Sequence, residues 1–286
     1  MLFSSPLLTV LTVLTATGIQ TVSAHTRLYA VSINGVDQGI GCDELEGDKN
    51  KEYIRCPPNT DPVKDWGSKD MACNADGEKE ADRWLPVKWG DKITFQWGYR
   101  KRSKDKSDDM IIDKSHKGPV LVYASPAPDG INQKQSWLKL FHSAGEGKTW
   151  AVEQLIEKKG LHWIEIPQLP PGKYFLRPEL IALHNGYSKP SRPSNPQPYM
   201  SCVQVEVKEE TGKGEALKAN AETCAFPGGY PTDTSKWKAV GLDFDIYTDE
   251  KTAVERYSKI MPGPKLAVNN VKGGFGEAPS KRRRKA

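Results

Sequence analysis

The sequence predicts an all-β protein with an immunoglobulin/fibronectin III-like β-sandwich, long loops and short helices. Short runs rich in β-branched and aromatic residues recur along the chain between Pro, Gly and Asn turns, a pattern typical of strands. Long amphipathic helices are hard to find, and residues 150–159 (WAVEQLIEKK) are the best short candidate. Many short strands joined by irregular loops favour two packed sheets.

The expected strands share the residue types of a half-buried pleated surface. Asn34-Gly35 directly follows the first of them and is a strong signal for a tight turn. Long loops are expected at about 37–90, which holds three cysteines, and at 98–115, a highly charged insertion. The strands are expected at 27–33, 93–97, 119–124, 136–141, 161–166, 173–183 and 202–207.

An apolar leader opens the chain. Residues 2–19 are uncharged and precede the small residues of the Val22-x-Ala24 pattern. This arrangement predicts a secretory signal peptide over 1–24, so we expect a secreted, extracellular protein whose mature chain begins at His25. The alternative is a buried N-terminal helix. Polar breaks make the leader a poor membrane span, and no other stretch approaches about 18 apolar residues, so no membrane association is expected.

The formal net charge of +5 comes from the C-terminal end of the chain. Residues 281–285 (KRRRK) carry five positive charges, so the remainder is formally neutral. Such a run resembles a nuclear-localisation patch, but the leader argues against that destination, and no nucleic-acid partner is expected. We expect one domain over 25–263 and a basic, disordered tail over 264–286, rich in Gly, Pro and Lys. Binding to an anionic surface, or processing, are alternative roles for the tail.

The chain has five cysteines, which suit the disulfides of a secreted protein. Two bridges leave one thiol over, and spacing alone does not assign the pairing. A bridge between Cys42 and Cys56, and a bridge from one of these to Cys224, both remain open.

The candidate metal ligands are histidines, because the chain contains no HExxH, CxxC or GxSxG motif. After cleavage, His25 offers a terminal amine and an imidazole, which chelate one metal in a compact ring. A second imidazole completes three nitrogens in a T-shape, which suits copper and disfavours tetrahedral zinc. We expect His142 and His162 to be surface or structural residues.

His116 and Tyr199 each stand directly before an expected strand. Gly118-Pro119 follows His116 and predicts a turn that directs the imidazole out of the sandwich edge. Tyr199 lies three residues before Cys202, where its phenol could be a weak axial ligand. The alternative for Tyr199 is a buried tyrosine at the sheet edge.

Several segments, in order, resemble the fungal lytic polysaccharide monooxygenases of auxiliary activity family 9, first classed among glycoside hydrolases. The resemblance covers nearly the whole chain from His25 onward. The segments are HT (25–26), SINGVDQGIG (32–41), PPNTDPVKDWGSKDMACN (57–74), HKGPVLVYAS (116–125), KTWAVEQLI (148–156), LPPGKYFLRPELIALHN (169–185), QPYMSCVQVEV (197–207), FPGGY (226–230), DFDIY (243–247) and PGP (262–264).

The resemblance implies a copper site. His25, through its amine and ring, and His116 would hold one copper ion per chain, with Tyr199 as the axial ligand. His184 and Gln197 match the family's pair that hydrogen-bonds the oxygen species, and groups of this kind orient ligands and set reactivity. Pro196 and Pro198 flank Gln197, a departure that puts its pose in doubt.

Further residues are implied by the same resemblance. Cys73 and Cys202 match a bridge from the long loop to the strand after the axial tyrosine. The 98–115 insertion directly precedes His116 and is expected to shape the surface near copper. Proteins that bind flat surfaces display exposed aromatic rings, and each candidate here is as readily a core residue. The candidates for substrate contact are Tyr29, Trp66, Tyr230 and Tyr247.

The implied activity is oxidative cleavage of a β-1,4-glucan, cellulose or a related glycan such as hemicellulose, at C1 and/or C4. A monomeric enzyme would use O2 or H2O2 and electrons from a small-molecule or enzymatic donor. The alternative is a secreted copper-binding or cell-wall protein that keeps the histidine brace without cleavage. A metal-free adhesin is a third possibility. His184 and Gln197 favour the enzyme, since copper capture alone would not need them.

Overall fold

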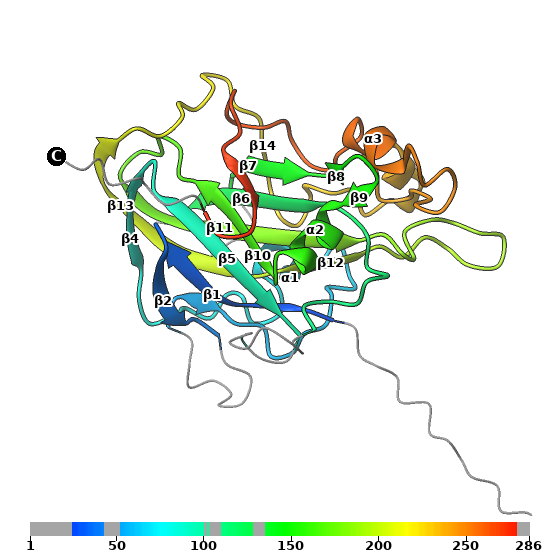
Figure 1. The fold of residues 1–286 in the computed structure, drawn as a ribbon, viewed down its shortest axis with the longest axis horizontal. Coiled ribbons are helices and arrows are strands. Elements are labelled where there is room, and N and C mark those ends of the chain that lie inside the picture. The colour runs from blue at the N-terminus through cyan, green and yellow to red at the C-terminus, as the bar shows by residue number, and fades with distance from the viewer. Residues whose placement is uncertain (1–24, 43–51, 100–101, 103–109, 128–134, 279–286) are drawn as a thin grey trace, which may run out of the picture.

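The computed structural model describes residues 25–42, 52–99, 102, 110–127 and 135–278 (Figure 1). The expected signal peptide, half of the 98–115 insertion and the KRRRK run lie outside the described residues. In the described part of the chain, no helix is long and apolar enough to cross a membrane.

The chain folds as an immunoglobulin-like β-sandwich, as predicted from the sequence. One sheet has the strand order β15-β10-β5-β1-β2, and the larger sheet has the order β14-β7-β6-β11-β13-β3. In the larger sheet, β12 also pairs with β11, and β4 runs parallel to β13. The core between the sheets contains apolar residues of both, such as Phe95 on one side and Val122 on the other. Alternating inward-facing residues therefore hold the two layers together.

Each strand expected from the sequence is present. They are β1 (Arg27–Ile33), β5 (Lys92–Gly98), β6 (Val120–Pro126), β7 (Trp137–Ser143), β10 (Leu161–Glu165), β11 (Gly172–Ala182) and β13 (Cys202–Gly212). Helix α2 (Ala151–Glu157) lies inside the expected helical segment. Asn34 and Gly35 have φ angles of 53° and 80°, the backbone that a tight turn between two strands requires. These elements formed as predicted because their local patterns agree with the tertiary packing.

We expected one long loop at 37–90, but this segment contains regular elements. It contains most of β2 (Val36–Ile40), then β3 (Ile54–Arg55), α1 (Asp70–Cys73) and β4 (Leu85–Trp89). These elements are short, and β2 is a largely exposed edge strand, so a hydrophobic pattern hardly marks them. The partner of β3 and β4 is strand β13, which is distant in sequence. The remaining short elements are β8 (Gly145–Glu146), β9 (Thr149–Trp150), β12 (Gln197–Met200), β14 (Thr223–Cys224), η2 (Thr234–Val240), α3 (Ala253–Ser258) and β15 (Gly273–Phe275).

A second hydrophobic core covers the outer face of the larger sheet. Side chains of β6 and β11, such as Tyr123 and Phe175, pack there against the C-terminal segment and the loop that holds α1. Trp66 and Tyr230 belong to this core, with ring centroids 5.7 Å apart. The larger sheet is therefore buried on both faces, and nearly every residue of β6 and most of β11 are buried.

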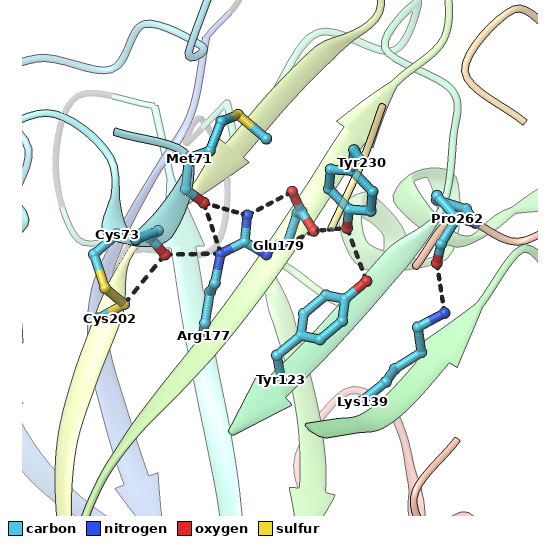
Figure 2. A network of polar contacts seen from close by, with 10 residues as sticks. Met71, Cys73, Tyr123, Lys139, Arg177, Glu179, Cys202, Tyr230 and Pro262 are labelled. Carbon is cyan, nitrogen blue, oxygen red and sulfur yellow. Dashed lines mark hydrogen bonds and ion pairs between the residues drawn. A yellow bond between two sulfur atoms is a disulfide. The ribbon is translucent and has the colours of Figure 1, made fainter. Parts of the chain in front are cut away.

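A polar network is buried inside this second core (Figure 2). Arg177 forms an ion pair with Glu179 at 2.8 Å, and both side chains are fully buried. Arg177 also donates to the carbonyl of Met71 at 2.9 Å. The Tyr230 hydroxyl donates to Glu179 and lies 2.8 Å from the hydroxyl of Tyr123. The network therefore connects α1, through Met71, and the segment that holds Tyr230 to strand β11.

Two disulfides are present. Cys73–Cys202 joins α1 to β13, as the family resemblance implied. Cys42–Cys56 is the second bridge, and it selects one of the two pairings that the sequence left open. Cys224 is free and partly buried, and burial raises the pKa of its thiol to about 12. Its thiol is therefore protonated and unreactive at neutral pH.

The structure describes the expected tail from residue 264 to 278, and this part of it lies against the sandwich. Strand β15 pairs with β10 as the edge of the smaller sheet, and the red C-terminal segment runs back along the sandwich (Figure 1). A Cβ at Gly273 would lie 2.6 Å from the ring of Phe141, so only glycine allows this close approach. Gly273 is therefore required by the packing of β15 against Phe141.

Candidate metal centre

The ends of several strands bring the expected site residues to one end of the sandwich. His25 directly precedes β1, and His116 lies in the turn before β6. His184 follows β11, and strand β12 carries Gln197 and Tyr199. Antiparallel pairing of β11 with β12 places Ala182 opposite Gln197, so the histidine after β11 lies beside the start of β12.

The rings of these residues are close together. The ring centroid of Tyr199 lies 6.0 Å from that of His25 and 6.2 Å from that of His116. The rings of His116 and His184 are closer, with centroids 4.1 Å apart. The Tyr199 hydroxyl donates a hydrogen bond to Gln197 Oε1 at 2.8 Å. All five residues implied by the sequence therefore form one cluster.

The turn that carries His116 is built for close backbone approach. A Cβ at Gly118 would lie 1.9 Å from the carbonyl oxygen of Ile181, so the turn requires glycine there. The backbone N–H of His116 donates to the carbonyl of Asp113 at 3.0 Å. Ser115 Oγ lies 3.2 Å from His116 Nδ1. The imidazole is buried, with 4% of its surface exposed, and is held in one orientation.

Burial keeps the imidazoles of His116 and His184 neutral. Burial lowers the pKa of His116 to about 4, and the neighbouring His184 contributes in the same direction. Burial also lowers the pKa of His184. The pKa of the Tyr199 phenol is raised, chiefly by burial and then by the charge of Asp61. At neutral pH the rings of His116 and His184 are therefore neutral, the form in which an imidazole binds a metal, and the phenol of Tyr199 is protonated.

The donor set fits copper bound by nitrogen. In the ranges that the structure describes, no group of three His, Cys, Asp or Glu side chains could hold a metal. A site built on His25 and His116 therefore needs a third donor from the main chain, which the terminal amine of a processed His25 would supply. His184 Nδ1 is buried and has no hydrogen-bond partner among the residues that the structure describes, so it can bond to a group bound beside it. A set of three nitrogen donors, two imidazoles and one amine, is a typical ligand set for copper.

Asp61 is part of this cluster, although the sequence reasoning did not select it. Its Oδ1 lies 2.7 Å from His25 Nδ1. The residue stands inside the PPNTDP stretch, which is part of the family resemblance, but nothing in that motif indicates a role for its carboxylate. Only the folded chain places this carboxylate beside a residue 36 positions earlier.

The structure corrects the expected substrate-contacting aromatics. Tyr29, Trp66 and Tyr230 are 1%, 6% and 1% exposed, so their rings are not available to a flat substrate. The first lies in strand β1, and the other two lie in the second hydrophobic core. Tyr247 is 46% exposed, and its hydroxyl lies 3.5 Å from the carbonyl of His184. Tyr187, which the sequence reasoning missed, packs edge-on against Tyr247 with centroids 5.8 Å apart.

The fold and the cluster define an immunoglobulin-like β-sandwich with paired imidazoles, a third histidine, a glutamine and a tyrosine at one end. The chain belongs to Auxiliary Activity family 9 (formerly GH61), whose model matches residues 25–257. AA9 family lytic polysaccharide monooxygenase B of Emericella nidulans is 42% identical over 243 residues, which are 85% of this chain and 60% of that protein. The chain spans 59–64% of the length of three such curated relatives.

Solved structures agree with this assignment. The structure titled CvAA9A is 36% identical, with a TM-score of 0.67 over 86% of this chain and 100% of that chain. A structure titled as a cellulose-active polysaccharide monooxygenase from M. thermophila is 25% identical, with a TM-score of 0.60 over 85% of this chain and 98% of that one. The similarity therefore covers most of the chain.

Proposed function

We propose that this protein is a secreted, copper-dependent lytic polysaccharide monooxygenase. It cleaves a β-1,4-glucan, cellulose or a related glycan, at C1 and/or C4, with O2 or H2O2 and electrons from an external donor. The observation that carries this proposal is the meeting of His25, His116 and Tyr199 at one end of the sandwich. Family membership and the copper-suited donor set support it.

Each residue of the cluster has a role in this proposal. His25, through its amine and ring, and His116 hold the copper, with Tyr199 beside them. Copper, when bound, supplies the one-electron chemistry that activates the oxygen co-substrate. Tyr199 stays protonated and its hydroxyl donates a hydrogen bond to Gln197 Oε1, which fixes the orientation of that amide. A neutral phenol is a weak donor, so it leaves the charge of the metal largely uncompensated.

His184 and Gln197 are suited to bind the co-substrate. The His184 ring lies against His116, and its buried Nδ1 lacks a partner among the described residues. Its lowered pKa keeps one ring nitrogen as a donor and the other as an acceptor at neutral pH. The pair can therefore give a hydrogen bond to reduced oxygen and exclude bulk water from it.

Tyr247 supports a flat polysaccharide as the substrate. Its exposed ring lies next to His184, so a sugar face stacked on it lies close to the proposed copper site. Cellulose is the proposed substrate because a relative of the same fold is titled cellulose-active. Secretion is supported by the N-terminal sequence, since only cleavage after Ala24 creates the amine at His25.

The proposal is tested with protein expressed with native processing, loaded with copper and incubated with cellulose and ascorbate. Oxidised oligosaccharides are expected from the wild type and not from His116→Ala. Tight copper binding with no products from cellulose, xyloglucan or xylan would instead identify a copper-binding protein without cleavage. A mature protein that retains residues 1–24 would exclude both, because His25 would have no free amine.

A further inference from the structure

A carboxylate lies against the ring nitrogen that copper chelation at His25 must use. A terminal amine and an imidazole of one residue close a compact chelate ring only through Nδ1, because Nε2 lies on the far side of the ring. Asp61 Oδ1 is 2.7 Å from this Nδ1. The Asp61 side chain is 49% exposed and that of His25 is 26% exposed, so the pair lies at the surface where a metal enters.

The backbone around Asp61 is tied to the strands that carry the rest of the cluster. Upstream, Arg27 of β1 donates to the carbonyl of Pro57 at 2.9 Å. Downstream, the N–H of Val63 donates to the carbonyl of Pro198 in β12 at 3.0 Å. Arg27 is two residues from His25, and Pro198 stands between Gln197 and Tyr199. The position of the carboxylate is therefore set by the same elements as the site itself.

Asp61 supplies a negative charge to a set of donors that otherwise has none. The carboxylate of Asp61 lies directly beside the ring nitrogen of His25, and its charge also acts on the phenol of Tyr199. The other nearby carboxylate, Asp113, faces His116 and His184 and is engaged by the N–H of Ser115 at 2.8 Å. A fixed negative charge stabilises a doubly charged ion more than a singly charged one, because the Coulomb energy scales with charge.

We infer that Asp61 is a positioning residue of the copper site: its carboxylate holds the His25 side of the site and favours copper(II) over copper(I). This inference rests on the proposed copper-binding function and extends it to a residue that tunes the metal. In the metal-free protein the carboxylate contacts His25 Nδ1. When the metal takes this nitrogen, the carboxylate stays beside it as a neighbouring charge.

The test compares wild type with Asp61→Asn, which keeps size and removes charge, and Asp61→Glu, which restores charge. Asp65→Asn, an exposed residue of the same segment, is the matched control for net charge. Copper(II) and copper(I) affinities, the copper(II) EPR spectrum and the reduction potential are measured on processed protein. Equal melting temperatures of the copper-free proteins show that the variants fold.

In Asp61→Asn we expect copper(II) binding to weaken about tenfold more than copper(I) binding, which raises the potential by about 59 mV for a one-electron couple. The EPR parameters should shift, Asp61→Glu should recover part of the change, and Asp65→Asn should match wild type. Unchanged or tighter copper(II) binding in Asp61→Asn would overturn the inference, because Asp61 would then merely compete for Nδ1. Failure of the wild type to bind copper would instead refute the proposed function.

Discussion

The imidazole rings of His116 and His184 lie face to face at a tilt of 33°, with centroids 4.1 Å apart. One ring precedes β6 and the other follows β11, and these strands pair side by side in the larger sheet. The pairing register places Val120 opposite Leu180, so the chain ends that carry the histidines emerge together. In the proposed function, one ring holds the metal and its neighbour binds the co-substrate.

The first prediction separates these roles. His184→Gln should leave the copper(II) affinity within about threefold of wild type, because this ring is not a ligand in the proposal. Its loss should slow cleavage about 100-fold or more, as for removal of a positioned proton donor. Isothermal titration with copper and initial rates on cellulose measure the two effects. His142→Gln on β7 is the matched control, and a His184→Gln variant that loses copper would contradict the assignment.

The second prediction concerns the substrate surface. Tyr247→Ala should weaken adsorption to cellulose severalfold, since a stacked ring is worth about 1 kcal/mol. The copper(II) EPR spectrum should not change, because the tyrosine is not a ligand. Binding isotherms on cellulose, with copper present, test this. Adsorption equal to wild type would show that the glycan lies elsewhere on the molecule.

The third prediction is a pH dependence of stability. His162 is fully buried, and burial lowers its pKa to about 3, below the value of about 6.5 expected in the unfolded chain. The unfolded state therefore binds more protons as the pH falls below 6.5, and the free energy of unfolding decreases down to pH 3. Urea denaturation at several pH values should show a slope that is shallower in His162→Gln, by up to about 1.4 kcal/mol per pH unit.

The glutamine variant keeps an acceptor for the indole N–H of Trp97, which donates to His162 Nδ1 at 3.3 Å. The effect should therefore be confined to low pH. If the variant and the wild type show the same slope, the acid sensitivity arises from other buried groups, such as His142, whose pKa is lowered to about 4 chiefly by burial.

The fourth prediction concerns the buried ion pair. Glu179→Gln should lower the free energy of unfolding by about 3–5 kcal/mol, because it leaves the Arg177 guanidinium uncompensated in the second core. Glu78→Gln breaks an exposed pair with Lys69 and should have little effect. Chemical denaturation at pH 7 gives both values. Similar stabilities for the two variants would show that water reaches Arg177.

The last prediction compares the disulfides. Replacing Cys73 and Cys202 by serine opens a loop with a sequence separation of 129, against 14 for Cys42 and Cys56. In the chain-entropy description a longer loop gives the larger stabilisation, so we expect the first pair of substitutions to cost about 1 kcal/mol or more beyond the second. Thermal unfolding of the two double variants measures the difference, and the reverse order would show that local packing dominates.

Local patterns sufficed for much of the fold. The alternation and residue types of 27–33 and 202–207 predict strands, because a strand places their apolar side chains together on a face that the core buries. Proposed ligands such as His116 were visible because each stands at the edge of a strand in a motif shared with a known family. These features depend on neighbours in sequence, or on segments whose order is itself informative.

Tertiary contacts decided the rest. The sequence does not distinguish a buried tyrosine from an exposed one, and only the second core determines that Tyr230 is covered while Tyr247 is not. In the sequence, Gly273 is only one residue of a Gly-rich stretch, and the close approach of Phe141 in the folded protein is what requires glycine there. Asp61 became part of the site only because its segment is held between β1 and β12. Burial and charge proximity arise from contacts between residues far apart in the chain, so no local pattern could have shown them.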